Sequence, residues 1–278
     1  MLNLSGKIDQ GTLQLLALIN QVTVEMGVEY LVVGATARDL VMHYGYGARI
    51  QRATQDLDFA IQIESWDVFT EFKDRLIANG FTERRSPQRV VSPTGMPVDI
   101  VPFGGIADNN SNIRWPPSGD LEMDVAGFDE AHRSTIQVLI QQDPLIQIPV
   151  ASPQGLALLK LIAWDDRDHD LRAKDAKDLA YLLESYQSVE KVVDRIYEID
   201  GLMQGYDWDI DQGSAHLLGI DTLAIAGRDA KTKVSKILNA NLQAEAPNYL
   251  VEEMSSRTGE DYDNKRRLLE AFSNGFHS

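Results

Sequence analysis

Two aspartates stand one residue apart in an otherwise apolar run, TQDLDFAI at residues 54–61. If this run is a strand, its side chains alternate between two faces, so Asp56 and Asp58 share one face and the large apolar residues share the other. The two carboxylates would then lie about 7 Å apart, and each would raise the free-energy cost of ionising the other. We therefore expect a positive charge beside them.

A third aspartate, Asp99, interrupts another apolar strand, MPVDIVPF at residues 96–103. Alone it would indicate only an edge-strand carboxylate that faces water. If its strand neighbours that of Asp56 and Asp58, however, three carboxylates converge on one point. Carboxylate oxygens suit hard divalent cations such as Mg²⁺, and two ions about 4 Å apart can share a bridging aspartate. The pattern therefore predicts that Asp56, Asp58 and Asp99 hold Mg²⁺, which supplies the missing positive charge.

A turn of small residues upstream could hold a phosphate group. The segment LVVGATARDL at residues 31–40 reads as a strand that runs through a turn into a helix. Such a turn presents backbone N–H groups and a helix N-terminus to an anion. We predict that Gly34, Ala35 and Thr36 bind nucleotide phosphates, with Thr36 adding a hydroxyl. The chain contains no Gly-Lys-Ser/Thr, so this turn is not a P-loop.

Three segments, VVGATARDL, TQDLDFAI and VDIVPF, resemble the three motifs of nucleotidyltransferases of the polymerase-β superfamily. The segment SPQGLALLKLIAWDDRDHDLRAKDAKDLAYLL is similar to the helical signature of the AbiEii/AbiGii toxin family, and the resemblance covers roughly residues 28–186. It implies that Asp56 and Asp58 hold both metal ions and that Asp99 completes one site near the incoming hydroxyl. Ala35 departs from the pattern, because the superfamily usually has glycine or serine there. This departure bears on triphosphate binding more than on the metal site.

The helical signature contains cations that could meet a triphosphate. Lys160 and Arg167 are seven residues apart, hence on one face of the same predicted helix, and both could contact the leaving pyrophosphate. The alternative is a surface stripe paired with neighbouring aspartates. We expect Lys174, Asp175 and Asp178 to brace two helices together, through pairs such as Arg167 with Asp178.

Composition restricts the partners. The 278 residues carry a net charge of −16, which repels phosphate backbones at long range and excludes general coating of nucleic acid. Local basic clusters could still dock RNA, and TERRSPQR, with Arg84, Arg85 and Arg89, is the better candidate than NKRR at residues 264–267. Trp115 is the best candidate to stack a base. Any RNA binding would therefore depend on such a local basic cluster at the rim of the active cleft.

Other chemistries fit less well. The chain has no cysteine, which excludes disulfides and thiolate sites, its five histidines lack metal-ligand spacing, and no Gly-x-Ser-x-Gly elbow is present. No apolar run approaches the roughly 20 residues of a membrane span, so we expect a cytoplasmic protein without a membrane partner.

The elements that must position these residues change character near residue 150. Before it, apolar spacing predicts a helix over 10–26 that ends at Gly27, a helix that begins after Ser65, and hairpins that turn at 93–95 and near 143–144. After it, only helices are predicted, over 153–165, 174–186, 188–198, 214–226, 229–241 and 263–273, with a loop at 205–213 as a possible hinge. The predicted fold class is α+β, a mixed α/β nucleotidyltransferase domain (1–150) followed by a C-terminal helical domain (151–278) that closes the NTP cleft.

The function predicted from these patterns is Mg²⁺-dependent transfer of an NMP from an NTP to an acceptor hydroxyl. The resemblance implies a toxin-like AbiEii relative that acts on RNA, especially tRNA ends, and that has a cognate antitoxin. Three alternatives stay open. The GATARD turn is also similar to that of CCA-adding enzymes, the acceptor could be a protein or a small molecule (a cationic one, given the net charge), and Ala35 could mark a non-catalytic nucleotide-binding module.

Overall fold

A computed structural model places residues 1–50, 56–243, 248–255 and 259–278. The chain separates into two compact units, one of Met1–Gly45 with Arg49–Ser152 and the other of Tyr46–Ala48 with Pro153–Ser278. Thr54 and Gln55, the first residues of the predicted aspartate strand, lie outside the described residues.

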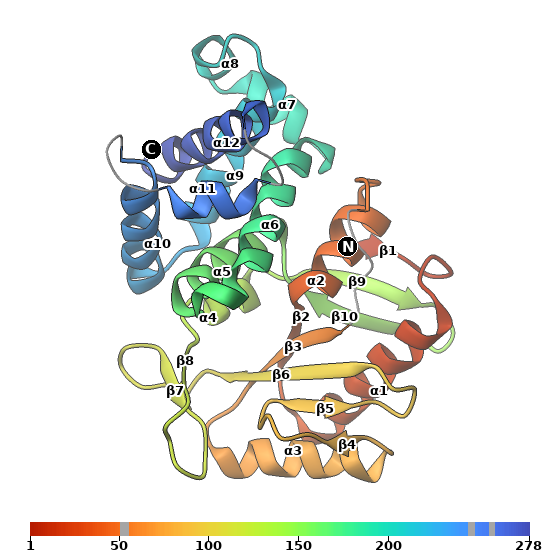
Figure 1. The fold of residues 1–278 in the computed structure, drawn as a ribbon. Coiled ribbons are helices and arrows are strands. Elements are labelled where there is room, and N and C mark those ends of the chain that lie inside the picture. The colour runs from red at the N-terminus through yellow and green to blue at the C-terminus, as the bar shows by residue number, and fades with distance from the viewer. Residues whose placement is uncertain (51–55, 244–247, 256–258) are drawn as a thin grey trace. The chain divides into compact units, whose positions relative to one another are not determined.

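The first unit is built on a mixed sheet (Figure 1). In spatial order its strands are β1 (Leu2–Asn3), β9 (Ile136–Gln141), β10 (Ile146–Val150), β2 (Tyr30–Val33), β3 (Leu57–Gln62), β6 (Pro97–Phe103), β5 (Arg89–Val91) and β4 (Thr82–Glu83). The pairs β1/β9, β10/β2 and β3/β6 are parallel, and the remaining neighbours are antiparallel. A separate ribbon of β7 (Asn112–Arg114) and β8 (Glu122–Asp124) precedes α4 (Phe128–Arg133). The mixed α/β fold class is confirmed.

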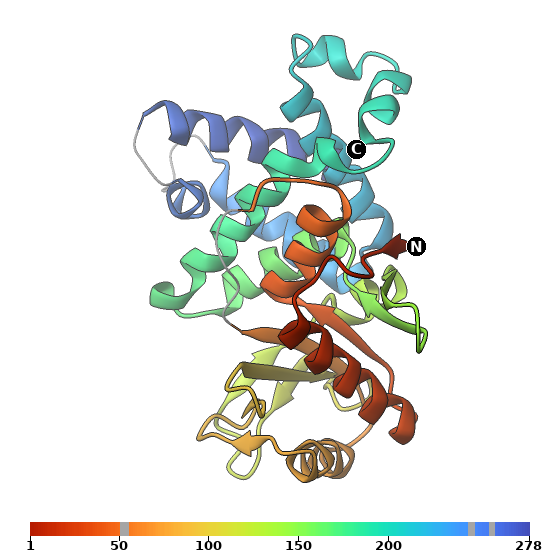
Figure 2. The same cartoon turned by 90° about the vertical axis from the view of Figure 1, so that its right-hand side faces the viewer.

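One face of the central strands is covered by two helices, α1 (Gln10–Met26) and α3 (Trp66–Ala78) (Figures 1 and 2). Phe59 of β3 packs edge-on against Phe72 of α3, and Tyr30 of β2 donates a hydrogen bond to Asn20 of α1. Because side chains alternate along β3, burying Phe59 under the helices turns Asp58 to the opposite face. The predicted division of this strand into an apolar face and an acidic face is confirmed.

The predicted end of α1 at Gly27 and the predicted start of α3 after Ser65 are confirmed. Asp9 caps α1 by accepting a hydrogen bond from the Thr12 N–H, and Gly27 ends the helix in the left-handed region at φ 63°. Helix α3 begins directly after Ser65. Both predicted hairpins, β5/β6 and β9/β10, are confirmed.

The predicted strand–turn–helix is also confirmed. Strand β2 runs into α2 (Gly34–Arg38), which continues as a π-helical segment, Asp39–Gly45. Wide π-turns of this kind are uncommon and recur at functional sites. Arg38 is 1% exposed and forms an ion pair with Asp39 at 2.7 Å.

The second unit is helical. Its elements are α5 (Pro153–Asp166), α6 (His169–Ser185), a 3₁₀ turn (Tyr186–Ser188), α7 (Val192–Glu198), α8 (Leu202–Gly205), α9 (Ile210–Ile225), α10 (Arg228–Asn241), α11 (Tyr249–Met254) and α12 (Glu260–Phe276). The helix predicted over 188–198 begins only at Val192, because Lys191 takes a left-handed φ of 68°. The loop predicted over 205–213 is shorter, since Asp209 caps α9 there. No helix in the described part of the chain is long and apolar enough to span a membrane.

Candidate active site

Three carboxylates meet on the acidic face of the sheet. Strands β3 and β6 are parallel neighbours in a register that sets Asp58 opposite Asp99. One oxygen from each of Asp56, Asp58 and Asp99 lies within 4.8 Å of the other two, and all three residues are half-buried. The predicted adjacency of the two strands is confirmed. Three carboxylate oxygens this close are a donor set that suits a hard divalent cation such as Mg²⁺.

Gly34 makes room for one of these carboxylates. Val33 is the register partner of Asp58, and Gly34 follows it at a left-handed φ of 66°. A Cβ on Gly34 would lie 2.8 Å from the Asp58 Cβ and would overlap the Asp58 carboxylate. Real Cβ contacts are never so short, so only glycine lets Asp58 stand against the turn. The glycine was predicted to bind phosphate, and the structure adds a packing reason for it.

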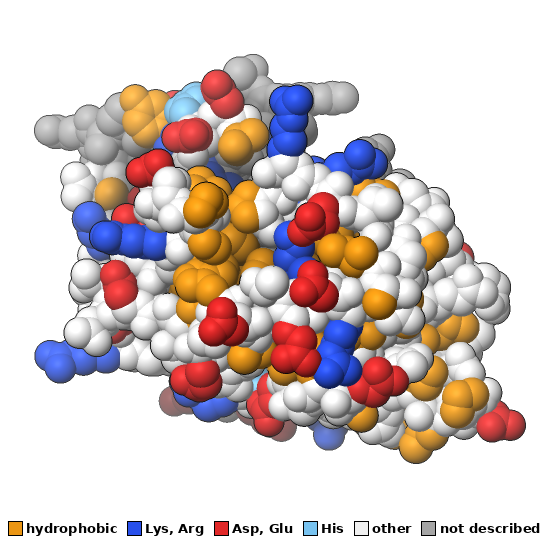
Figure 3. All heavy atoms as spheres, turned by 90° about the horizontal axis from the view of Figure 1, so that it is seen from below, with side chains coloured by type: hydrophobic (Ala, Val, Ile, Leu, Met, Phe, Trp, Pro, Cys, Tyr) orange, Lys and Arg blue, Asp and Glu red, His pale blue; other side chains and the backbone are white. Residues whose placement is uncertain are grey.

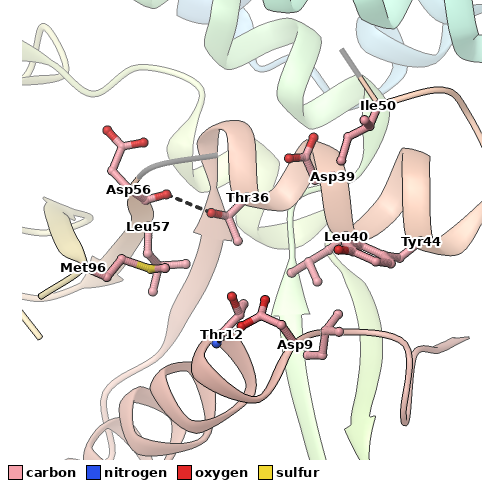
Figure 4. A pocket seen from close by; sticks show the side chains of 11 residues that line it. Asp9, Thr12, Thr36, Asp39, Leu40, Tyr44, Ile50, Asp56, Leu57 and Met96 are labelled. Atoms are coloured by element: carbon pink, nitrogen blue, oxygen red, sulfur yellow. Dashed lines mark hydrogen bonds between the residues drawn. The ribbon is translucent and has the colours of Figure 1, made fainter. Parts of the chain in front are cut away.

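Thr36 and Ala35 lie in the same turn with little exposure, 8% and 9%. The Thr36 hydroxyl donates a hydrogen bond to the backbone oxygen of Asp56 at 3.1 Å (Figure 4). It thereby ties the turn to the residue that begins the acidic strand. With its proton used in this way, Thr36 offers a phosphate no donor from its side chain. Phosphate binding by Gly34, Ala35 and Thr36 stays a prediction, to which backbone N–H groups would contribute most.

A cavity of about 230 Å³ lies beside this turn, on the side of α1 and the π-helical segment (Figure 4). Its walls are Ile8, Asp9, Thr12, Thr36, Asp39, Leu40, Tyr44, Ile50, Asp56, Leu57 and Met96. Ligand pockets usually occupy roughly 300–1,000 Å³. This cavity is smaller than that range, and we assign no nucleotide to it.

A cation, Arg89, lies beside these carboxylates. It lies on β5 directly opposite Asp99 on β6. Its Nε donates to Asp99 Oδ1 at 2.7 Å and its Nη2 to Oδ2 at 2.6 Å. The hydrogen bond to Asp99 raises the pKa of Arg89, and the charges of Asp99, Asp56 and Asp58 raise it further. A guanidinium therefore supplies one positive charge beside the aspartates.

A signal for this pair was present in the sequence. The first hairpin was predicted to turn at residues 93–95. Counting outward from Thr94 by five residues in each direction pairs Arg89 with Asp99, which is the observed register. Arg89 had instead been grouped with Arg84 and Arg85 as a basic patch. Those two arginines are exposed, whereas Arg89 belongs to the acidic site.

In the helical unit, Lys160 and Arg167 are held in ion pairs. The Lys160 ammonium lies 2.8 Å from carboxylate oxygens of both Asp175 and Asp178, and Arg167 pairs with Asp175. Burial opposes the charge of Lys160, but the two carboxylates outweigh it, so the pKa of Lys160 lies above its ordinary value. The predicted pair of Arg167 with Asp178 is wrong, because Lys160 takes Asp178. Lys174, predicted to brace the helices, is exposed, and Lys160 has that role.

We expect Lys160→Ala to destabilise the protein by about 3–5 kcal/mol, since it leaves charge buried without its partner. Asp175 and Asp178 are only 1% and 3% exposed, so little water solvates their charge. Lys174→Ala, the matched control on an exposed lysine, should change the free energy of unfolding by less than about 0.5 kcal/mol. Denaturant titration measures both. Equal unfolding midpoints for the two variants would contradict the bracing role.

Trp115 does not offer a face to a base. It is 2% exposed and packs against Trp66 and Phe69, with ring centroids 5.1 and 5.5 Å away. The prediction that it stacks a base is wrong, because the loop that carries it closes over the aromatic residues of α3.

The two basic clusters differ in environment. In NKRR, Lys265 is buried and paired with Glu184, and Arg266 pairs with Glu270, so this cluster braces α12. Arg84 and Arg85 are exposed. On the face of the molecule seen in Figure 3, basic side chains are interspersed with acidic ones.

The arrangement defines a class of protein. An Asp-x-Asp strand, a third aspartate in register on the parallel neighbour and a glycine turn against Asp58 are arranged on one mixed sheet, as the resemblance to polymerase-β type nucleotidyltransferases predicted. The chain belongs to the AbiEii family, because the family model described as "Nucleotidyl transferase AbiEii toxin, Type IV TA system" matches residues 21–264. It is an enzyme of the nucleotidyltransferase kind, and the predicted family is confirmed.

Solved structures that resemble this chain share little sequence with it. An antigenic nucleotidyltransferase-like protein from Paracoccidioides brasiliensis is 13% identical over 71% of this chain and 93% of its own, with a TM-score of 0.40. The antibiotic-resistance factor ANT(2'')-Ia is 13% identical over 72% and 98%, with a TM-score of 0.36. A Thermotoga maritima CCA-adding enzyme complexed with tRNA is 12% identical over 98% and 82%, with a TM-score of 0.27. No curated protein matches the chain in sequence.

Proposed function

We propose that this enzyme transfers an NMP from an NTP to an acceptor hydroxyl and that it depends on Mg²⁺ held by Asp56, Asp58 and Asp99. The observation that carries the proposal is the meeting of these carboxylates within 4.8 Å of one another. Bound there, Mg²⁺ would stabilise the charge on the attacking and leaving oxygens of an in-line displacement at the α-phosphorus. The sheet supports this role because the parallel strands β3 and β6 hold Asp58 opposite Asp99, and Asp56 directly precedes β3.

The chain's own residues have distinct tasks in this proposal. Asp56 and Asp58 are the shared ligands, and Asp99 orients the acceptor hydroxyl beside them. The backbone N–H groups that follow Gly34 receive the phosphates, which makes Ala35 compatible with binding because its missing hydroxyl is not required. If Ala35 does weaken binding, the protein would be a non-catalytic nucleotide-binding module, which is the second candidate function.

In this proposal the helical domain of residues 151–278 closes over the nucleotide. Arg167 is the better candidate for the triphosphate, because its side chain is 38% exposed whereas that of Lys160 is 12% exposed. Asp175 accepts from both residues, so Lys160 would support Arg167 through this shared carboxylate. In this proposal Lys160 and Arg167 act together on the leaving pyrophosphate.

Incubation with each α-labelled NTP, total RNA and cell extract tests the function. Transfer of label to a macromolecule or small molecule, in Mg²⁺ but not in EDTA, is expected. A thermal shift with each NTP, with and without Mg²⁺, separates the second candidate. If no nucleotide stabilises the protein in a metal-dependent way and no label is transferred, the non-catalytic module is favoured.

For the acceptor we propose RNA, in particular tRNA ends, with the cytoplasm as the compartment and a cognate antitoxin as the regulator. The family description, a toxin of a toxin–antitoxin system, supports a target inside the producing cell. Arg84 and Arg85 are the exposed cations proposed to contact the RNA backbone. The net charge of −16 keeps a cationic small molecule or a protein as the competing acceptor.

We expect Arg84→Ala with Arg85→Ala to weaken RNA labelling and to reduce its salt dependence by up to about two counterions' worth of slope. Arg89 is left out of this variant, since its loss would disturb Asp99 as well. The matched control is Arg228→Ala with Lys231→Ala, which removes two exposed charges at the start of α10. An unaltered salt slope in the Arg84/Arg85 variant, or label that never reaches RNA, would argue for the competing acceptor.

A further inference from the structure

The ion pair between Arg89 and Asp99 uses both oxygens of a carboxylate in the active site. Two N–H groups in a planar fork donate to the two oxygens at 2.7 and 2.6 Å, the strongest geometry available to an arginine–carboxylate pair. The two residues are register partners on adjacent antiparallel strands. The backbone of the hairpin therefore presents the guanidinium to Asp99 without any rearrangement.

The pair also lies within the field of the other two aspartates. One carboxylate oxygen from each of Asp56, Asp58 and Asp99 lies within 4.8 Å of the other two, so the guanidinium that contacts Asp99 lies close to all three charges. Like-charged carboxylates this close repel one another, and one cation among them offsets part of that repulsion. Arg89 thus stabilises the folded protein in the absence of a divalent ion.

A divalent ion and the Arg89 guanidinium would compete for the Asp99 carboxylate. An ion held by Asp56, Asp58 and Asp99 would have to share Asp99 with Arg89 and would be repelled by it. The Arg89 side chain is 39% exposed and Asp99 is 18% exposed, so the pair is open enough to give way at modest cost. The two cations are therefore coupled. The Arg89–Asp99 ion pair lowers the affinity for the metal ion, and the bound metal ion weakens the ion pair to the same extent.

We propose that Arg89 is a resident counter-ion of the metal site, which stabilises the cluster without metal and weakens its affinity for the divalent ion. The inference rests on the proposed function in that it takes Asp56, Asp58 and Asp99 as metal ligands. Arg89 would then set the concentration of divalent ion that is needed to fill the site.

The test is direct binding of Mn²⁺ and Mg²⁺ to the nucleotide-free protein by calorimetry, with melting temperatures in EDTA and in saturating metal. Arg89→Ala should bind metal about tenfold more tightly than wild type, a size typical of coupling between two sites. It should melt at a lower temperature in EDTA, and saturating metal should remove most of that difference. Arg89→Gln, which keeps part of the stem without the charge, should behave likewise and covers the case in which the alanine variant does not fold.

Two controls isolate the pair. Arg75→Ala removes a similarly exposed arginine from its ion pair with Glu71 on α3, away from the carboxylates, and should leave metal affinity unchanged. In an Asp99→Asn background, Arg89→Ala should no longer lower the melting temperature in EDTA as it does in wild type, because the carboxylate that it serves is gone.

The outcomes separate the two proposals. Wild type and Arg89 variants that bind metal equally well would overturn the counter-ion role while leaving the metal site intact. Weaker binding by the variants would also overturn it, since Arg89 would then hold Asp99 in place for the metal. If neither wild type nor the Arg89 variants bind a divalent ion, the metal site itself fails, and the proposed function fails with it.

Discussion

Asp58→Asn is expected to lower the rate of nucleotidyl transfer by on the order of 10³-fold while leaving the protein folded. Asp58 lies at the centre of the cluster, opposite Asp99 across the β3/β6 pair and against the Gly34 turn. Asparagine keeps the shape of the side chain but removes the negative charge that Asp58 would offer to the metal ion. A metal site contributes several kcal/mol to the transition state, and each 1.36 kcal/mol is about tenfold in rate.

Stability should change little in Asp58→Asn, or rise slightly, because one of three neighbouring like charges is removed. The assay is kcat/KM for label transfer, paired with a melting temperature in EDTA. Asp120→Asn, at an exposed loop position, is the matched control and should keep full activity. Wild-type turnover in Asp58→Asn would show that the cluster is not catalytic, and unfolding would show that Asp58 is structural.

Gly34→Ala should reduce kcat/KM by about 100-fold or more, because the new Cβ displaces Asp58 from its place. The left-handed φ of 66° adds a stability loss of about 1–2 kcal/mol. Gly27→Ala is a matched control, since Gly27 has a φ of 63° but no atom within 4 Å of the position that a Cβ would take. It should lose similar stability and keep its activity.

Comparison of the two glycine variants separates the effect of backbone strain from that of the steric clash with Asp58. If both lose only stability, Gly34 is a turn residue and its contact with Asp58 is without catalytic consequence. If Gly34→Ala alone loses activity at a temperature where both variants are folded, the close approach of the turn to Asp58 is required. Metal affinity measured on the same samples should weaken in Gly34→Ala only.

Local patterns in the sequence determined much of this protein. The two-residue period of a strand is enough to set Asp56 and Asp58 on one face, and helical spacing with a left-handed glycine is enough to end α1 at Gly27. The turn at residues 93–95 fixed the β5/β6 pairing. These features depend on neighbours a few residues apart, so the sequence alone contains their physical cause. The set of three motifs predicted that Asp99 lies near the other two aspartates, and the sheet confirms it.

Tertiary structure alone decided which charges meet. By its spacing Lys160 was predicted to contact the leaving pyrophosphate, but the packing of α6 on α5 brings the buried Asp175 and Asp178 to it. Trp115 looked available in its loop, but that loop folds onto α3. Such outcomes depend on which surfaces become neighbours and on how much water is then excluded. A linear pattern of residue types does not contain that information, because a long charged or aromatic side chain pairs equally well with many partners until the fold selects one.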